Sequence, residues 1–128
     1  MSTIPSRPIS SISRTDFGSA STKNESPHVP VLLLDREGTI QHSNKPARRV
    51  LEYSSDAPLD SCFFSHIHGR NLRRVMRDLA HMVNHRKQRA RWLLRLRTGN
   101  GRWRWYRAIA QNHLDHSDAA IRIRLRPL

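Results

Sequence analysis

The stretch from Arg89 to Tyr106 has the sequence RARWLLRLRTGNGRWRWY, and its pattern decides the class of fold. Between residues 89 and 97 the even positions are apolar and most odd positions are arginine, which is the two-residue period of a strand with one buried and one solvated face. Residues 98–101, TGNG, supply a turn, because Asn-Gly is a strong local signal for a hairpin. The stretch therefore predicts two antiparallel strands, the second beginning at Arg102.

The same alternation returns near the C-terminal end of the chain. Residues 121–126 have the sequence IRIRLR, and the polar loop 113–118 separates them from the preceding strand. At the other end, residues 31–34 (VLLL) precede a turn that contains Gly38, and residues 39–44 form the returning strand of a first hairpin. Five antiparallel strands are expected in all.

Two helices are expected between the first hairpin and the last three strands. Pro46 in a first helical turn, followed by Ala47, Val50 and Leu51, predicts a short helix. A longer helix, capped by Asn71, would carry apolar residues on one face, namely Leu72, Val75, Met76, Leu79, Met82 and Val83. Its opposite face would hold Arg70, Arg73, Arg74, Arg77, His81 and His85. The predicted fold class is α+β, a five-stranded antiparallel sheet with short helices and one long helix packed on one face.

The composition allows one small, basic domain. The chain has 128 residues and a formal net charge of +13, and 20 of its 23 basic residues lie in residues 28–128, which carry a net charge of +12. Residues 1–27 are rich in Ser, Thr and Pro and predict a flexible leader, although an organellar transit peptide is an alternative. Residues 28–128 would form the folded domain. The sequence lacks a run of about 18 apolar residues and a secretory signal, and it has a single cysteine, so we expect no membrane span and a cytoplasmic location.

Several motifs in this order resemble those of PAS domains, and the resemblance covers about residues 29–128. The first hairpin is similar to the recurrent L-x-D-x-x-G-x-I-x-x-x-N-x-x-A of the family, with Leu33, Asp35, Gly38, Ile40, Asn44 and Ala47 at the matching spacings. Tyr53 stands where many members have the Tyr of Gly-Tyr, but Glu52 replaces the glycine. Ile67-His68 resembles the start of I-H-P-D-D, and residues 100–105, NGRWRW, resemble the D-G-x-x-R-W hairpin.

The resemblance implies a sensory or protein-interaction module without catalysis of its own, which commonly forms dimers in signal transduction. In this family the helices and the inner face of the sheet enclose a pocket, and the outer face carries dimer or effector contacts. A protein partner or self-association is therefore expected, and a small-molecule ligand is an alternative to a filled core. The residues that would line such a pocket are Met76, Leu79, Val83, Trp92, Leu94, Trp103 and Trp105.

Arginine is the unusual feature of the predicted sheet. One strand would present Arg89, Arg91, Arg95 and Arg97 on a single face, and another would present Arg122, Arg124 and Arg126. These rows would lie on the outer surface and attract phosphates or acidic protein, so the alternative function is a basic adaptor that binds nucleic acid or an acidic partner. Strand alternation favours Tyr106 as the aromatic residue on that face, with Trp103 and Trp105 on the opposite one. A simply solvated arginine face is the plain alternative.

Cofactor, metal and enzyme chemistry have little support, and no cofactor is expected. Cys62 stands about where flavin-binding members of the family carry a reactive cysteine, and haem-binding members ligate iron through a histidine that would correspond to His81 or His85. The same two histidines could hold zinc with His66 or His68, but no thiolate pair or HExxH motif accompanies them. The sequence contains no Ser-His-Asp order, phosphate-binding loop or paired-carboxylate spacing, so we expect no enzymatic activity.

Overall fold

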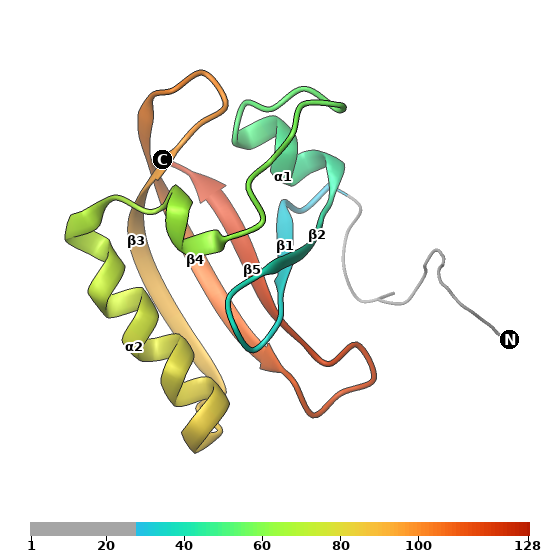
Figure 1. Ribbon diagram of the computed structural model, residues 1–128, viewed down its shortest axis with the longest axis vertical. Helices are drawn as coiled ribbons and strands as arrows, with labels where there is room; N and C mark the ends of the chain where they lie inside the picture. The colour runs from blue at the N-terminus through green and yellow to red at the C-terminus, as the bar shows by residue number, and fades with distance from the viewer. Residues whose placement is uncertain (1–27) are drawn as a thin grey trace, which may run out of the picture.

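The computed structural model describes residues 28–128, which form a five-stranded antiparallel sheet with its helices on one side (Figure 1). In chain order the elements are β1 (Val31–Leu34), β2 (Ile40–Ser43), α1 (Lys45–Val50), the 3-10 helix η1 (Phe63–His66), α2 (Gly69–His85), β3 (Arg89–Arg97), β4 (Trp103–His113) and β5 (Ala120–Pro127). The strands lie in the order β2-β1-β5-β4-β3. The predicted fold class is confirmed. The leader predicted for residues 1–27 lies outside the described residues.

The turn between β1 and β2 is shaped by Asp35 and Gly38. Oδ1 of Asp35 accepts hydrogen bonds from the backbone N–H groups of Glu37 and Thr39, each at 2.9 Å. Gly38 has a φ of 82°, and a Cβ atom at this position would lie 2.6 Å from the ring of Phe64 in η1. Only glycine combines the left-handed backbone with this close approach. The turn thus brings η1 against the end of the first hairpin.

Asn44 joins β1 to the start of α1. Its Oδ1 accepts from the backbone N–H of Val31 at 3.0 Å and from that of Ala47 at 2.9 Å, so one side chain both holds the strand and caps the helix. Its Nδ2 donates to the carbonyl oxygen of Val29 at 2.7 Å. The short helix predicted around Pro46 is present.

The loop between β3 and β4 fixes the register of the two longest strands. The backbone N–H of Thr98 donates to the carbonyl oxygen of Arg102 at 2.8 Å, and Arg97 lies opposite Trp103. Three residues, 99–101, therefore form the loop, and Gly101 has the left-handed backbone of a three-residue hairpin, with a φ of 80°. Residues directly opposite each other share a face of the sheet. Because the loop is odd in length, odd positions of β3 and β4 face the same side.

The inner face of the sheet and the helices enclose the core. Tyr106 and Phe63 are the largest fully buried side chains, and the remaining fully buried ones are Leu32, Leu34, Val75, Met82, Leu94, Leu96, Ile121 and Ile123. Tyr106 donates a hydrogen bond through its hydroxyl to the carbonyl oxygen of Val50 at 2.6 Å, which ties β4 to α1. Among the described residues, no helix is long and apolar enough to cross a membrane.

Helix α2 begins three residues earlier than the sequence suggested. Its N-cap is His68, whose Nδ1 accepts from the backbone N–H of Arg70 at 3.2 Å. The prediction that Asn71 caps the helix is wrong, because Oδ1 of Asn71 instead accepts from the backbone N–H of Arg95 at 3.0 Å and so binds α2 to β3. At the other end, Nδ2 of Asn112 donates to the carbonyl oxygen of Met82 at 3.0 Å, which holds the last turn of α2 against β4.

Candidate functional site

The outer face of the sheet is the side that the helices leave uncovered. On β3 the odd residues 89–97 point to this face, because the even residues Ala90, Trp92, Leu94 and Leu96 are buried under α2. The register then places Arg107 of β4 beside Arg126 of β5, and Ile109 beside Arg124. We define the outer face by its described arginines, which are Arg89, Arg91, Arg95, Arg97, Arg107, Arg122, Arg124 and Arg126.

All seven arginines predicted for this face lie on it, and the sequence interpretation missed an eighth. Arg107 stands opposite Leu93 on β3 and Arg126 on β5, in the middle of the face. Once the loop 99–101 is known to hold three residues, the odd-numbered residues of β4, Arg107 among them, are expected on the outer face. The two predicted arginine rows share this face without being adjacent, because β4 lies between β3 and β5.

Two tryptophans occupy the end of the outer face near the 99–101 loop. Trp103 is 46% exposed and Trp105 is 42% exposed. The guanidinium carbon of Arg95 lies 5.0 Å from the centroid of the Trp105 ring, which is within the range of a cation–π contact. The ring of His68 meets that of Trp103 edge to face, with 4.9 Å between centroids.

The predicted orientation of these aromatic residues is therefore wrong. Trp103 and Trp105 were expected inside and Tyr106 outside, but Tyr106 is fully buried and both tryptophans are exposed. A four-residue turn at residues 98–101 would have paired Arg97 with Arg102, whereas the observed loop pairs Arg97 with Trp103. A shift of one residue in register moves every side chain of a strand to the other face.

The other predicted pocket residues divide between core and surface. Leu79, Trp92 and Leu94 are buried in the core, and Val83 is partly buried against it. Met76 is 46% exposed, because it lies one residue beyond Val75 and therefore about 100° around the helix from the buried side of α2. Trp103, Trp105 and Met76 thus do not line an interior pocket.

Trp92 shows how this fold treats an indole that belongs to the core. Its Nε1 donates to Oδ2 of Asp78 at 2.8 Å, and Asp78 also lies 3.4 Å from Nζ of Lys87. Burial raises the pKa of the Asp78 carboxyl. The hydrogen bonds from Trp92 and Lys87, together with the positive charge of Lys87, lower it by more and leave the pKa below its ordinary value. The carboxylate is a structural acceptor between α2 and β3.

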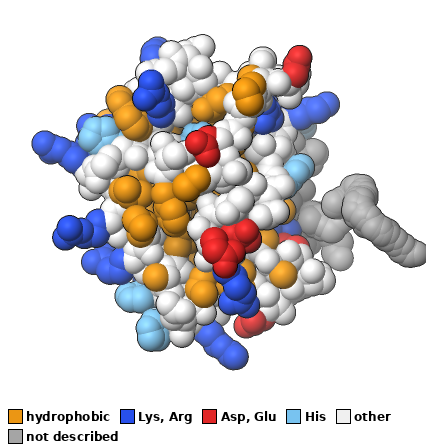
Figure 2. Space-filling view, in the orientation of Figure 1, with side chains coloured by type: hydrophobic (Ala, Val, Ile, Leu, Met, Phe, Trp, Pro, Cys, Tyr) orange, Lys and Arg blue, Asp and Glu red, His pale blue; other side chains and the backbone are white. Residues whose placement is uncertain are grey.

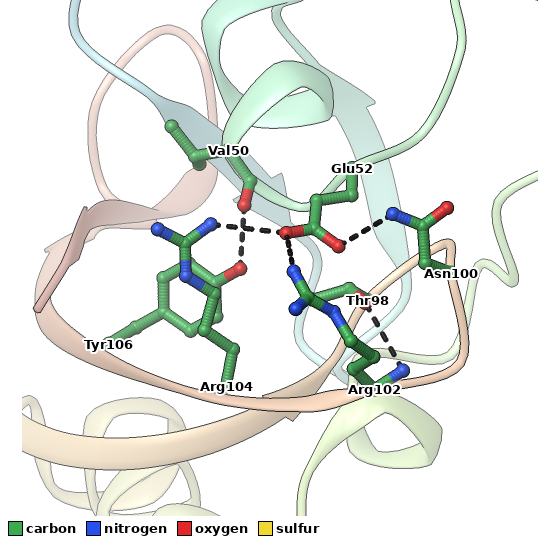
Figure 3. A network of polar contacts seen from close by, with 7 residues as sticks. All are labelled: Val50, Glu52, Thr98, Asn100, Arg102, Arg104 and Tyr106. Atoms are coloured by element: carbon green, nitrogen blue, oxygen red, sulfur yellow. Dashed lines mark hydrogen bonds and ion pairs between the residues drawn. The ribbon is translucent and has the colours of Figure 1, made fainter.

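Glu52 binds two arginines at the start of β4, on the inner side of the sheet (Figure 3). Its two carboxylate oxygens accept from Nδ2 of Asn100 at 2.9 Å, from Arg102 at 2.7 Å and from Arg104 at 3.2 Å. These contacts, with the Arg102 hydrogen bond first, hold the pKa of Glu52 below its ordinary value. Glu52 has a φ of 65°, so the position where the family has glycine keeps its left-handed backbone while the side chain joins α1 to the 99–101 loop.

Among the residues that the structure describes, the outer face has no comparable source of negative charge. Asp118 lies 3.4 Å from Nε of Arg122 and is the acidic residue that pairs with an outer-face arginine within residues 28–128. In the same part of the chain, the other seven outer-face arginines form no ion pair with a carboxylate. Figure 2 looks at the opposite, helical side, where Lys and Arg side chains are spread around the outline and apolar side chains gather nearer the middle.

A hollow of about 310 Å³ lies on the outer face where β1 and its preceding residues meet β5 and β4. Its apolar lining includes Val29, Pro30 and Ile109. Three arginines surround it, namely Arg107, Arg124 and Arg126. The hollow therefore combines an apolar floor with a cationic rim.

The residues considered for cofactors and metals do not converge. Cys62 is exposed, and so are His81 and His85, whose ring centroids lie 5.4 Å apart on the outside of α2. His66 is buried and contacts the carbonyl oxygen of Asp60 through Nε2 at 2.8 Å. Over residues 28–128, no three His, Cys, Asp or Glu side chains are grouped so that they could hold a metal ion. Cys62, His81 and His85 thus lie at the surface of the domain, and His66 lies in its interior.

Comparisons with known proteins agree with this architecture. The chain matches the family model of the PAS fold over residues 41–124. A search of curated protein sequences finds no match. Among solved structures, the PAS-B domain of Drosophila melanogaster Cycle with bound ethylene glycol has a TM-score of 0.65 at 11% identity, and the match covers 77% of this chain and 99% of that one.

Two bacterial structures are similar in the same way. The PAS domain of a protein from Colwellia psychrerythraea has a TM-score of 0.64 at 12% identity, covering 79% of this chain and 86% of that one. The PAS domain of nitrogen regulation protein NR(II) from Vibrio parahaemolyticus has a TM-score of 0.57 at 13% identity, with coverages of 78% and 89%. The fold, the motifs of the first hairpin and the family match lead to one conclusion: this chain belongs to the PAS fold family.

Proposed function

We propose that this chain is a non-catalytic PAS module of cytoplasmic signal transduction that works by binding an acidic partner on the outer face of its sheet. The observation that carries the proposal is the set of seven outer-face arginines without a carboxylate partner among the described residues. Uncompensated charge of one sign on a surface attracts partners of the opposite sign and speeds their association.

The burial of large side chains in the core favours contact at the surface over sensing of a ligand in the interior. The place where a pocket was expected holds buried side chains, among them Tyr106, Trp92 and Leu94. Large side chains packed at crystal-like density leave no room for a ligand without rearrangement. A partner would act on this module by binding one conformation of the sheet or its flanking segments more tightly than another.

Charge also bears on self-association. Two copies that met through their outer faces around a two-fold axis would bring arginines of the same sign together, because such an interface pairs a patch with itself. We therefore propose a partner of opposite charge rather than a second copy of this chain for the outer face. Sedimentation velocity at 50 mM NaCl should show a monomer. A dimer that weakens when Arg107, Arg124 and Arg126 are replaced by glutamine would contradict this choice.

Retention on immobilised heparin, a polyanion, tests which surface binds anions. The variant R107Q/R124Q/R126Q removes three charges from the outer face, and R70Q/R73Q/R74Q removes three exposed charges from α2. We expect the outer-face variant to elute at clearly lower salt than both the wild type and the α2 variant. Equal shifts for the two variants would show that net charge alone governs retention and would contradict the proposal.

A further inference from the structure

The outer face pairs its arginines with exposed aromatic rings, which a surface built only for solvation does not need. Trp103 and Trp105 lie on the same face as Arg95 and Arg97, directly opposite them across the β3–β4 ladder. Nearly half of each tryptophan residue is exposed, although a tryptophan is normally buried to a high degree. The same chain buries Trp92 and gives its Nε1–H an acceptor, so exposure of the other two is a property of the outer face.

We propose that the outer face binds single-stranded nucleic acid, with bases stacked on Trp103 and Trp105 and phosphates bound by the arginines. This inference rests on the proposed function, because it uses the same face, and it names the chemistry of the partner. Proteins that bind single strands combine a cationic track for the backbone with aromatic rings on which bases stack. Sheets that present aromatic side chains bind unpaired RNA bases in other folds.

The aromatic rings and the arginines follow one another across the outer face. Consecutive outward residues on one strand are about 6.8 Å apart, so the two indoles offer separate stacking positions along β4. Arg107 follows at the next outward position, with Arg126 opposite it on β5. Beyond them lies the hollow of about 310 Å³ with its apolar floor and the rim of Arg107, Arg124 and Arg126. A strand that crosses the face would thus meet rings first and then a cationic hollow.

Other anions fit this face less well. An acidic peptide neutralises guanidinium groups but offers no flat aromatic partner to two indoles. A duplex presents phosphates but keeps the faces of its bases stacked inside, and reading it in the major groove takes a protruding helix or β-ribbon. Among residues 28–128 the outer face presents no helix to a groove, because α2 lies on the opposite side of the sheet. A single strand uses the arginines and the tryptophans together.

Fluorescence anisotropy with a 5′-fluorescein-labelled dT20 oligonucleotide tests the inference on the full chain. We expect binding at 50 mM NaCl that weakens steeply at 200 mM NaCl. The variant W103A/W105A should lose at least about fivefold in affinity for each indole removed. Binding should also quench the emission of the wild type, while W103A/W105A, which keeps only the buried Trp92, should show little quenching.

The two arginine triples separate a defined track from general charge. R107Q/R124Q/R126Q should bind dT20 at least tenfold more weakly at 50 mM NaCl and should lower the slope of log affinity against log salt by about 2, since a single strand contributes about 0.7 per phosphate contact. R70Q/R73Q/R74Q, with the same loss of charge, should change affinity much less. Circular dichroism melting curves should confirm that each variant is folded.

Several outcomes would overturn the inference. They are absence of dT20 binding at 50 mM NaCl, equal loss in the two arginine triples, unchanged affinity in W103A/W105A, and a self-complementary DNA hairpin or polyglutamate competing as well as dT20 at equal charge. If the outer-face triple still loses retention on heparin, only the nucleic-acid inference fails and the proposed acidic partner stands. If retention on heparin does not depend on the outer face, the proposed function fails as well.

Discussion

Each side of β4 carries arginines and aromatic residues, but those on the inner side have partners within the fold and those on the outer side face solvent. On the inner side Arg102 and Arg104 are bound by Glu52, and the hydroxyl of Tyr106 is bound by Val50. On the outer side Trp103, Trp105 and Arg107 project from the sheet. Within residues 28–128 the side chain of Arg107 binds neither a carboxylate nor a backbone carbonyl oxygen. The inner polar groups therefore serve the stability of the fold, and the outer ones are available for binding.

The largest contrast in stability is expected between adjacent aromatic residues. Replacing Tyr106 with alanine should lower the free energy of unfolding by about 3–5 kcal/mol, because a fully buried ring and its hydrogen bond are lost. Replacing Trp105 with alanine should cost clearly less, about 1–2 kcal/mol, since the residue is already 42% exposed and the change removes only its partial burial and its contact with Arg95. Urea denaturation of the two variants measures the difference, and similar losses would refute the assignment of faces.

The buried contact between Asp78 and Trp92 should rank next. Asp78→Ala leaves the Nε1–H of Trp92 without its acceptor and should cost about 1–3 kcal/mol. A double-mutant cycle with Trp92→Phe checks the cause, because the loss from Asp78→Ala should be smaller when the indole N–H is absent. Additive losses would show that the carboxylate acts through Lys87 or through packing instead.

Glu52 should make the stability of the folded chain depend on pH. Its pKa is lowered in the folded chain, so its contribution to stability is present above the ordinary glutamate pKa and is lost as the pH falls through the lower folded value. Glu52→Gln should therefore be less stable than the wild type at pH 7, and the difference should shrink as the pH falls below about 4. Thermal melts across this pH range measure it.

A second glutamate provides the control for that experiment. Glu37 is exposed in the turn between β1 and β2 and forms no ion pair among the described residues. Glu37→Gln should follow the wild type over the same pH range. A difference between wild type and Glu52→Gln that is constant with pH would mean that the ion pairs of Glu52 do not contribute.

The smallest effect on stability is expected from the outer arginines. R107Q/R124Q/R126Q removes exposed side chains without carboxylate partners in residues 28–128, so the free energy of unfolding should stay within about 0.5 kcal/mol of the wild type. Relief of repulsion between like charges should make any change stabilising at low salt. A clear loss of stability would show that the guanidinium stems hold the fold by covering apolar surface.

Much of the fold could be predicted because strand and helix periods are local signals. The alternation in residues 89–97 identified which side of β3 is buried, and the spacing around Pro46 located α1. The start of α2 was predicted wrongly because asparagine is a residue type that often caps helices. In the structure Asn71 instead accepts a hydrogen bond from Arg95, 24 positions away in the chain.

The candidate site was harder to predict because it depends on the register between strands. The positions of seven outer arginines follow from alternation within each strand alone. Trp103, Trp105, Tyr106 and Arg107 depend in addition on whether the hairpin loop holds three residues or four. Local propensity favours a turn at Asn100-Gly101 in both cases, whereas the observed register buries Tyr106, whose hydroxyl donates to the carbonyl oxygen of Val50 in α1.

The odd length of the 99–101 loop has a consequence for how this protein and its relatives vary. Deleting or inserting one residue that shifts the pairing of Arg97 from Trp103 to a neighbour would force two indoles toward a filled core and expel Tyr106. Lineages that change the parity of this loop must exchange the apolar and polar positions of β4 at the same time. The number of residues in this loop and the pattern of apolar and polar positions in β4 should therefore covary among relatives.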